Sequence, residues 1–108
     1  MRLITEMGEA ERRIESETPV VVVMSMNSCT FCADARRALQ NIECSCGSQD
    51  IEFVEIDIGS LKDIAEKYSI ESAPTVIIFR NGIIIEHMVG AAKIPEYETA
   101  IRRIFEQV

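Results

Sequence analysis

The chain has 108 residues, of which 47% are hydrophobic and 27% are charged, and it carries a formal net charge of −7 at pH 7. This length suits one domain, and the apolar share is large enough for a packed core, which excludes a polar disordered chain. The acidity makes nucleic acid a poor partner, because affinity for nucleic acid depends on neutralising phosphates.

The first half of the chain predicts a helix, a buried strand and a second helix. A polar segment at 5–16 carries apolar residues at helical spacing and predicts a surface helix. Residues 20–24 are a β-branched run without alternation, which is typical of a central strand covered on both faces. An apolar stripe at steps of three and four predicts the second helix from about Cys29 to Ile42. The polar residues 43–50 are expected to form a loop.

A second strand and a short helix follow. Residues 51–57 are rich in Ile, Phe and Val and predict the strand. Ser60 and Asp63 resemble a capping box, in which two side chains bond the first free N–H groups of a helix. The inner stripe of that helix would consist of Leu61, Ile64, Ala65 and Tyr68.

The last part of the chain predicts a β-hairpin and a final helix. Residues 75–79 and 83–89 are apolar runs on either side of Asn81-Gly82, which is the strongest short hairpin signal. Pro95 suits the first turn of a helix, because proline lacks only an N–H that is free there anyway. The apolar face of this helix would consist of Tyr97, Ile101, Ile104, Phe105 and Val108.

Strands that alternate with helices imply an α/β fold with right-handed crossovers. We therefore predict a single domain over residues 1–108 with a central mixed, mainly parallel sheet of four to five strands. Helices should cover both faces of this sheet, and a C-terminal β-hairpin plus helix should complete the domain.

Cys29 and Cys32 stand where the first buried strand gives way to a helix. A helix N-terminus offers about half a unit of positive charge and free N–H donors, which would stabilise a thiolate at Cys29. A cysteine three positions further on lies within bridging distance, so Cys32 can resolve a mixed disulfide. Two small core residues or a zinc-binding pair are the alternatives, but the position at a strand–helix junction favours redox chemistry.

Four short motifs occur in a fixed order: Cys29-Thr30-Phe31-Cys32, Ser72-Ala73-Pro74-Thr75, Phe79-Arg80-Asn81-Gly82 and Val89-Gly90-Ala91. On these motifs and their spacing the chain resembles the thioredoxin superfamily, and thioredoxins more than glutaredoxins. The resemblance covers most of the chain. A Cys-x-x-Cys pair is only moderately specific by itself, whereas all four motifs in this order are strongly specific.

The resemblance implies a thioredoxin-like fold and a thiol–disulfide oxidoreductase that serves electron transport and redox homeostasis. Cys29 would attack a protein disulfide and Cys32 would resolve the intermediate. No bound organic cofactor or metal is required, since a reductase or an upstream dithiol supplies the electrons. We expect a monomer with no nucleic-acid or membrane partner.

The resemblance also implies a substrate-binding surface beside the cysteines. Pro74 would be cis, and Ala73 would pair with an extended substrate peptide by strand-like hydrogen bonds. Substrate contacts would also involve Thr30, Phe31 and Gly90. Simpler interpretations stay open, since Pro74 also suits the start of a strand, Phe31 an ordinary helix position and Gly90 a turn at a strand end.

Several positions depart from the family pattern. The chain contains no tryptophan, and Ser28 precedes the first cysteine. Val23 stands where the family buries an aspartate that helps the second cysteine to lose its proton, and Phe53 stands where it often has a lysine. We therefore expect slow resolution of the mixed disulfide at neutral pH. A glutaredoxin-like, glutathione-dependent enzyme is one alternative, and a binding module with an iron–sulfur or zinc site between subunits through Cys29 is the other.

Cys44 and Cys46 form a second close pair. Their possible roles are an accessory redox pair, a strained disulfide, a link between monomers, regulation of the domain by oxidation, an intermolecular metal site, or two cysteines that stay reduced. One zinc site holding all four cysteines would require breaking the helix that begins near Cys29, since its ends lie about 20 Å apart.

Membrane residence and export are not expected. The longest apolar run is residues 20–24, whereas a membrane-spanning helix needs about 20 apolar residues. The N-terminus becomes acidic at Glu6 instead of showing the apolar stretch of a signal peptide. Close cysteine pairs in such a chain fit a reducing compartment, so we expect a cytoplasmic protein.

Overall fold

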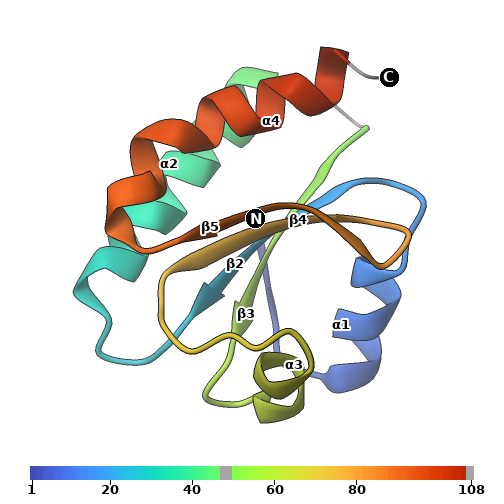
Figure 1. Ribbon diagram of the computed structural model, residues 1–108. Helices are drawn as coiled ribbons and strands as arrows, with labels where there is room; N and C mark the ends of the chain where they lie inside the picture. The colour runs from blue at the N-terminus through green and yellow to red at the C-terminus, as the bar shows by residue number, and fades with distance from the viewer. Residues whose placement is uncertain (47–49, 107–108) are drawn as a thin grey trace.

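The computed structural model describes residues 1–46 and 50–106. Figure 1 shows its elements around one sheet. In chain order they are β1 (Arg2–Ile4), α1 (Met7–Ile14), β2 (Val20–Ser25), α2 (Thr30–Cys46), β3 (Glu52–Asp57), α3 (Lys62–Lys67), β4 (Thr75–Arg80), β5 (Ile83–Val89), the 3₁₀ helix η1 (Ala91–Glu96) and α4 (Tyr97–Glu106).

The described strands form one sheet in the order β1-β3-β2-β4-β5. β3 runs parallel to both β1 and β2, whereas β4 runs antiparallel to both β2 and β5. The predicted α/β fold with a mixed sheet, a β-hairpin and a final helix is confirmed. The alternation of strands and helices predicted a β4 parallel to β2, and this detail is wrong, since β4 runs opposite to the other described strands.

The direction of β4 follows from the shortness of α3. Asp57 at the end of β3 and Thr75 at the start of β4 both lie at the C-terminal end of β2, opposite Ser25 and Met24. A six-residue helix is about 9 Å long, whereas a strand of six residues is about 20 Å long. The chain therefore re-enters the sheet at the end where it left, which makes β4 antiparallel to β2.

The core has two layers, one on each face of the sheet. Figure 1 shows α2 and α4 over one face, and α1 and α3 on the other. All six residues of β2 are buried, and its side chains alternate between the two layers, with Val22 in one and Val23 in the other. The prediction of a central strand covered on both faces is confirmed.

Local signals located the hairpin correctly but not every helix end. Asn81 and Gly82 have φ angles of 55° and 78°, which the tight turn between β4 and β5 requires. The predicted capping box is wrong, because the Ser60 hydroxyl donates to Asp57 Oδ2 at 3.3 Å and Leu61 precedes α3 without a side-chain cap. Pro95 lies in η1 and not in the first turn of α4.

Two other differences concern the ends of the sheet and of α2. β1 was not predicted, because three residues are too few for a sequence pattern. The expected loop at 43–50 begins later than predicted, since α2 continues to Cys46 and the Ser45 hydroxyl donates to the Asn41 carbonyl at 2.9 Å. Residues 47–49 of the expected loop lie outside the described residues.

Tyr97 is fully buried, and within the described part of the chain its hydroxyl has no hydrogen-bond partner. An unpaired buried hydroxyl costs about 1–3 kcal/mol, so Tyr97→Phe should raise the free energy of unfolding by about 1 kcal/mol. Burial raises the pKa of Tyr97 to about 12. Because this value exceeds the ordinary 10.0, the wild type loses stability as the pH rises from about 10 to 12, and the advantage of the variant should grow there. Urea unfolding checks this, and a less stable variant would contradict it.

Candidate active site

The cysteine pair lies at the junction between β2 and α2. Cys29 and Cys32 form a disulfide with their Cα atoms 5.3 Å apart. Ser28 has a φ angle of 61°, a left-handed conformation that turns the chain from the strand into the helix. The Cys32 N–H, in the first turn of α2, donates to the Cys29 sulfur at 3.1 Å. The helix N-terminus therefore directs a backbone donor at this sulfur, which is the arrangement that stabilises a thiolate.

The two sulfur-bearing residues differ in exposure. Cys32 is 2% exposed and belongs to the inner stripe of α2, whereas Cys29 is only half-buried. A hollow of about 410 Å³ opens beside the disulfide. It is lined by Met26, Asn27, Ser28, Cys29, Thr30, Cys32, Ala33 and Arg36. A substrate sulfur can therefore approach Cys29, while Cys32 is shielded behind it.

The loop before β4 lies at the same end of the sheet. The Ala73–Pro74 peptide bond is cis, as the resemblance implies. The Thr75 hydroxyl donates to the Ser72 carbonyl at 2.7 Å, and the Gly90 N–H donates to the Pro74 carbonyl at 2.9 Å. Since Thr75 pairs with Met24 near the end of β2, these bonds fix the loop and Gly90 close to the β2–α2 junction.

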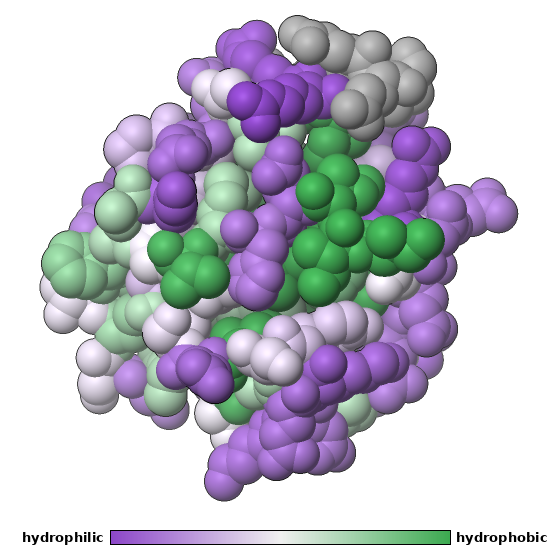
Figure 2. Space-filling model, in the orientation of Figure 1, coloured by the Kyte–Doolittle hydropathy of each residue, from purple (hydrophilic) through white to green (hydrophobic). Residues whose placement is uncertain are grey.

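Apolar side chains remain exposed around this end of the molecule and along β5. Phe31 is 55% exposed although it lies next to the buried Cys32, and Met26 and Val89 are also exposed. Figure 2 shows apolar surface gathered over β5, where Ile83 and Ile84 are exposed. Phe31 is thus not part of the core, which leaves its ring free to contact another molecule.

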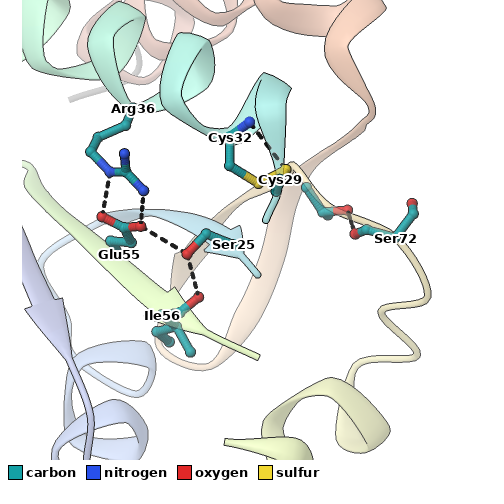
Figure 3. Close-up of a disulfide and its surroundings, with 8 residues drawn as sticks. Ser25, Cys29, Cys32, Arg36, Glu55, Ile56 and Ser72 are labelled. Carbon is teal, nitrogen blue, oxygen red and sulfur yellow. Dashed lines mark hydrogen bonds and ion pairs between the residues drawn. A yellow bond between two sulfur atoms is a disulfide. The ribbon is translucent and has the colours of Figure 1, made fainter. Parts of the chain in front are cut away.

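A partly buried ion pair lies one helical turn beyond the cysteines, as Figure 3 shows. Arg36 donates two hydrogen bonds to the Glu55 carboxylate, at 2.7 and 2.6 Å, and the Ser25 hydroxyl donates a third at 2.8 Å. Glu55 is only 8% exposed. The hydrogen bonds from Arg36 are the main reason why the pKa of Glu55 lies below its ordinary value, against the opposing effect of burial.

The sequence did not predict this pair. Arg36 lies against Glu55, whereas its neighbour Arg37 is exposed and pairs with Asp34 on the same helix. Two signals were available in the sequence. Arg36 follows the inward-facing Cys32 by four residues, and Glu55 occupies an inward-facing position two residues after Phe53.

Cys44 lies far from the disulfide. α2 is continuous from Thr30 to Cys46, so Cys44 lies about 18 Å along the helix axis from Cys32. Cys44 is an exposed free thiol, and the side chain of Cys46 is outside the described part of the chain. The described residues contain no group of three or more metal-ligating side chains. An accessory redox role for these cysteines stays a prediction.

The helices of the described residues include none that is long and apolar enough to cross a membrane.

Known proteins resemble the chain in sequence and in structure. A family model described as Thioredoxin matches residues 4–103. Thioredoxin C-2 of Corynebacterium nephridii is 29% identical over 79 residues, which cover 73% of this chain and 72% of that protein. A thioredoxin of Echinococcus granulosus is 43% identical over 44 residues, a match that spans 41% of either chain. The crystal structure of thioredoxin from Trypanosoma brucei brucei superposes with a TM-score of 0.85 at 19% identity, covering 96% of this chain and 89% of that chain. This last likeness shows that the fold is thioredoxin-like.

Proposed function

The chain belongs to the thioredoxin family and is a thiol–disulfide oxidoreductase, in which we propose that Cys29 is the nucleophile and Cys32 the resolving cysteine. The observation that carries this assignment is the difference in exposure within one disulfide. Cys29 lines the hollow and accepts the N–H of the first helical turn, whereas Cys32 is 2% exposed. A nucleophile must reach the substrate, and a resolving thiol needs to reach only its partner sulfur.

The proposed reaction has two exchange steps. In the reduced protein the Cys29 thiolate attacks one sulfur of a substrate disulfide and releases the other as a thiolate. Cys32 gives its proton through water to that released thiolate. Its own thiolate then attacks the Cys29 sulfur, which re-forms the Cys29–Cys32 disulfide and releases the second substrate sulfur. Two electrons pass from the protein to the substrate, and a reductase or dithiol donor restores the protein dithiol.

We propose that substrate peptides bind along Ala73 and Pro74, with Thr30, Phe31 and Gly90 around them. The exposed ring of Phe31 supports this, because it offers apolar contact beside Cys29. Gly90 supports it as well, since a Cβ placed there would meet nothing within 4 Å although its φ of +88° disfavours other residues. The substrate side of this position is therefore open.

The family acts on protein disulfides and works with reductase partners. For this chain we propose a single domain that works as a monomer in the cytoplasm. The two core layers share one sheet, which supports a single folding unit. The exposed free thiol of Cys44 is compatible with a compartment that keeps thiols reduced.

A redox titration tests the proposed function. The protein is equilibrated across a graded dithiol redox buffer, and its free cysteines are alkylated and identified by mass spectrometry. We expect Cys29 and Cys32 to titrate together as one two-electron couple, with Cys44 alkylated at every potential. A midpoint near about −270 mV would indicate a reductant, and one above about −200 mV an oxidant.

Two results of this titration would contradict the proposed function. Cysteines that never pair, or that resist alkylation until a chelator is added, would instead indicate a metal-binding or other binding module. A matched assay on a glutathionylated peptide and on a protein disulfide completes the test. Turnover that requires glutathione would indicate a glutaredoxin-like enzyme.

A further inference from the structure

The hollow beside the disulfide contains one side chain with a full positive charge. Its lining includes both cysteines and Arg36, which follows Cys32 by four residues on the same helix. Residues four apart on a helix are neighbours, with Cβ atoms about 5–6 Å apart. The Arg36 side chain therefore borders the same water-accessible space as the two cysteines.

A carboxylate on the sheet side of Arg36 neutralises its charge. Glu55 accepts two hydrogen bonds from Arg36 and is buried under the helix, whereas Arg36 itself remains partly exposed. Ser25, at the end of β2, fixes the carboxylate from the other side. Figure 3 shows the Glu55 carboxylate of β3 bonded to Arg36 of α2 and to Ser25 of β2. The cation thus lies on the side of the hollow and the anion on the side of the sheet.

Resting on the proposed function, we propose that Arg36 stabilises the thiolate of the Cys29–Cys32 pair by its charge and that Glu55 is a positioning residue that holds and moderates this charge. The reaction remains the two-step exchange given above, and no further proton acceptor is needed. The positive charge of Arg36 stabilises the Cys32 thiolate that forms when Cys32 has given its proton to the released substrate thiolate. The Arg36–Glu55 ion pair lies beside Val23, which stands where the family buries an aspartate, because Val23 and Glu55 are register partners in β2 and β3.

Several charged groups on α2 and on neighbouring elements have partners of their own. On α2, Arg37 pairs with Asp34 at 3.3 Å, and both side chains are exposed. On β3, Asp57 accepts the Gly59 N–H and the Ser60 hydroxyl. From β2 only the neutral Ser25 contacts the pair. On η1, Lys93 pairs with Glu96. The test therefore changes the charge of Arg36 and of Glu55, one at a time.

The test uses two substitutions that break the same ion pair but leave opposite charges. Glu55→Gln keeps the shape of the side chain and leaves the Arg36 charge unbalanced, so it should stabilise the thiolate. The equilibrium constant for reduction of the disulfide by glutathione should rise about fivefold, which corresponds to about 20 mV. Arg36→Gln leaves the carboxylate unbalanced and should lower the constant by a similar factor. The double variant should lie near the wild type.

The pH profile gives a second readout. The midpoint for alkylation of the reduced protein should move to lower pH in Glu55→Gln and to higher pH in Arg36→Gln. Arg37→Gln is the matched control, because it removes the same charge from the neighbouring position without lining the hollow, and it should shift neither quantity. Arg36→Lys keeps the charge and should retain most of the wild-type equilibrium constant.

A purely structural role would move both single variants in the same direction, since both lose the same hydrogen bonds. Shifts of the same sign, or no shift in Glu55→Gln, would overturn this inference. If Arg36→Gln does not fold, the direction of the shift in Glu55→Gln decides. A Cys29–Cys32 couple that titrates normally without these shifts leaves the proposed function intact, whereas loss of the couple in the wild type would refute the function itself.

Discussion

Replacing Cys32 with serine should convert the protein into a trap that holds its substrates as mixed disulfides, while turnover falls to background. Cys29 keeps its accessible sulfur and the N–H donor of the helix, so the first exchange step still occurs. A serine hydroxyl does not ionise at neutral pH and cannot displace the substrate sulfur. Cys29→Ser should instead lose both turnover and mixed disulfides. Non-reducing gels and mass spectrometry of the adducts measure the difference.

The matched control is Cys44→Ser. Cys44 is exposed, but it lies on the last turns of α2 far from the disulfide, so its removal should leave turnover unchanged. Combining Cys44→Ser with Cys32→Ser also excludes adducts formed at the second thiol. Turnover that survives in Cys29→Ser, or a trapped adduct that maps to Cys44, would refute the assignment of nucleophile and resolving cysteine.

The parts of the fold that sequence predicts best are those that local chemistry determines. The run at 20–24 has no polar side of its own, so only a strand covered on both faces could bury it, and all of β2 is buried. Asn81-Gly82 allows the positive φ angles of a tight turn. The Cys29–Cys32 pair is likewise local, because a spacing of three positions at the start of a helix brings two sulfurs within bonding distance.

The features that sequence missed depend on distant partners. The direction of β4 depends on where the chain re-enters the sheet, which residue patterns within β4 cannot encode. The three residues of β1 gain their stability from pairing with β3, and not from their own propensity. Arg36 and Glu55 are 19 residues apart, and although their spacing puts each at an inward-facing position, only the packing of α2 on the sheet shows that they pair. Long-range pairing of this kind is visible only in three dimensions.

Restoring the family carboxylate at Val23 should destabilise the protein by about 3–5 kcal/mol at neutral pH rather than improve it. Val23 is fully buried in the layer under α2, and its register partner on β3 is Glu55. Partners in parallel strands direct their side chains to the same face, so Val23→Asp would place a second carboxylate beside the first. Arg36 already gives two hydrogen bonds to Glu55, which leaves the new charge without a cation of its own.

The pH dependence of Val23→Asp distinguishes charge from polarity. Burial and the nearby Glu55 should raise the pKa of the new aspartate above about 3.9, its value in the unfolded chain. Below pH 4 the variant should therefore lose only about as much stability as burial of a neutral polar group costs, and the loss should grow as the pH rises through the raised pKa. Val23→Asn is the matched control, since it buries a polar group of similar size without a charge, and its cost should not change over this range. Urea unfolding at several pH values measures both variants.

Val23→Asp also tests the expected slow resolution, because the lifetime of the mixed disulfide can be followed against pH in the wild type and in this variant. A wild-type lifetime as short as that of an ordinary thioredoxin would show that Val23 does not limit the loss of the Cys32 proton. If Val23→Asp is as stable as the wild type at pH 7 and resolves faster, then Arg36 neutralises Glu55 well enough for a second carboxylate to act beside it. If it is unstable at pH 7 and recovers at low pH, Glu55 already holds the one negative charge that this layer of the core tolerates, and Val23 is the residue that fits beside it.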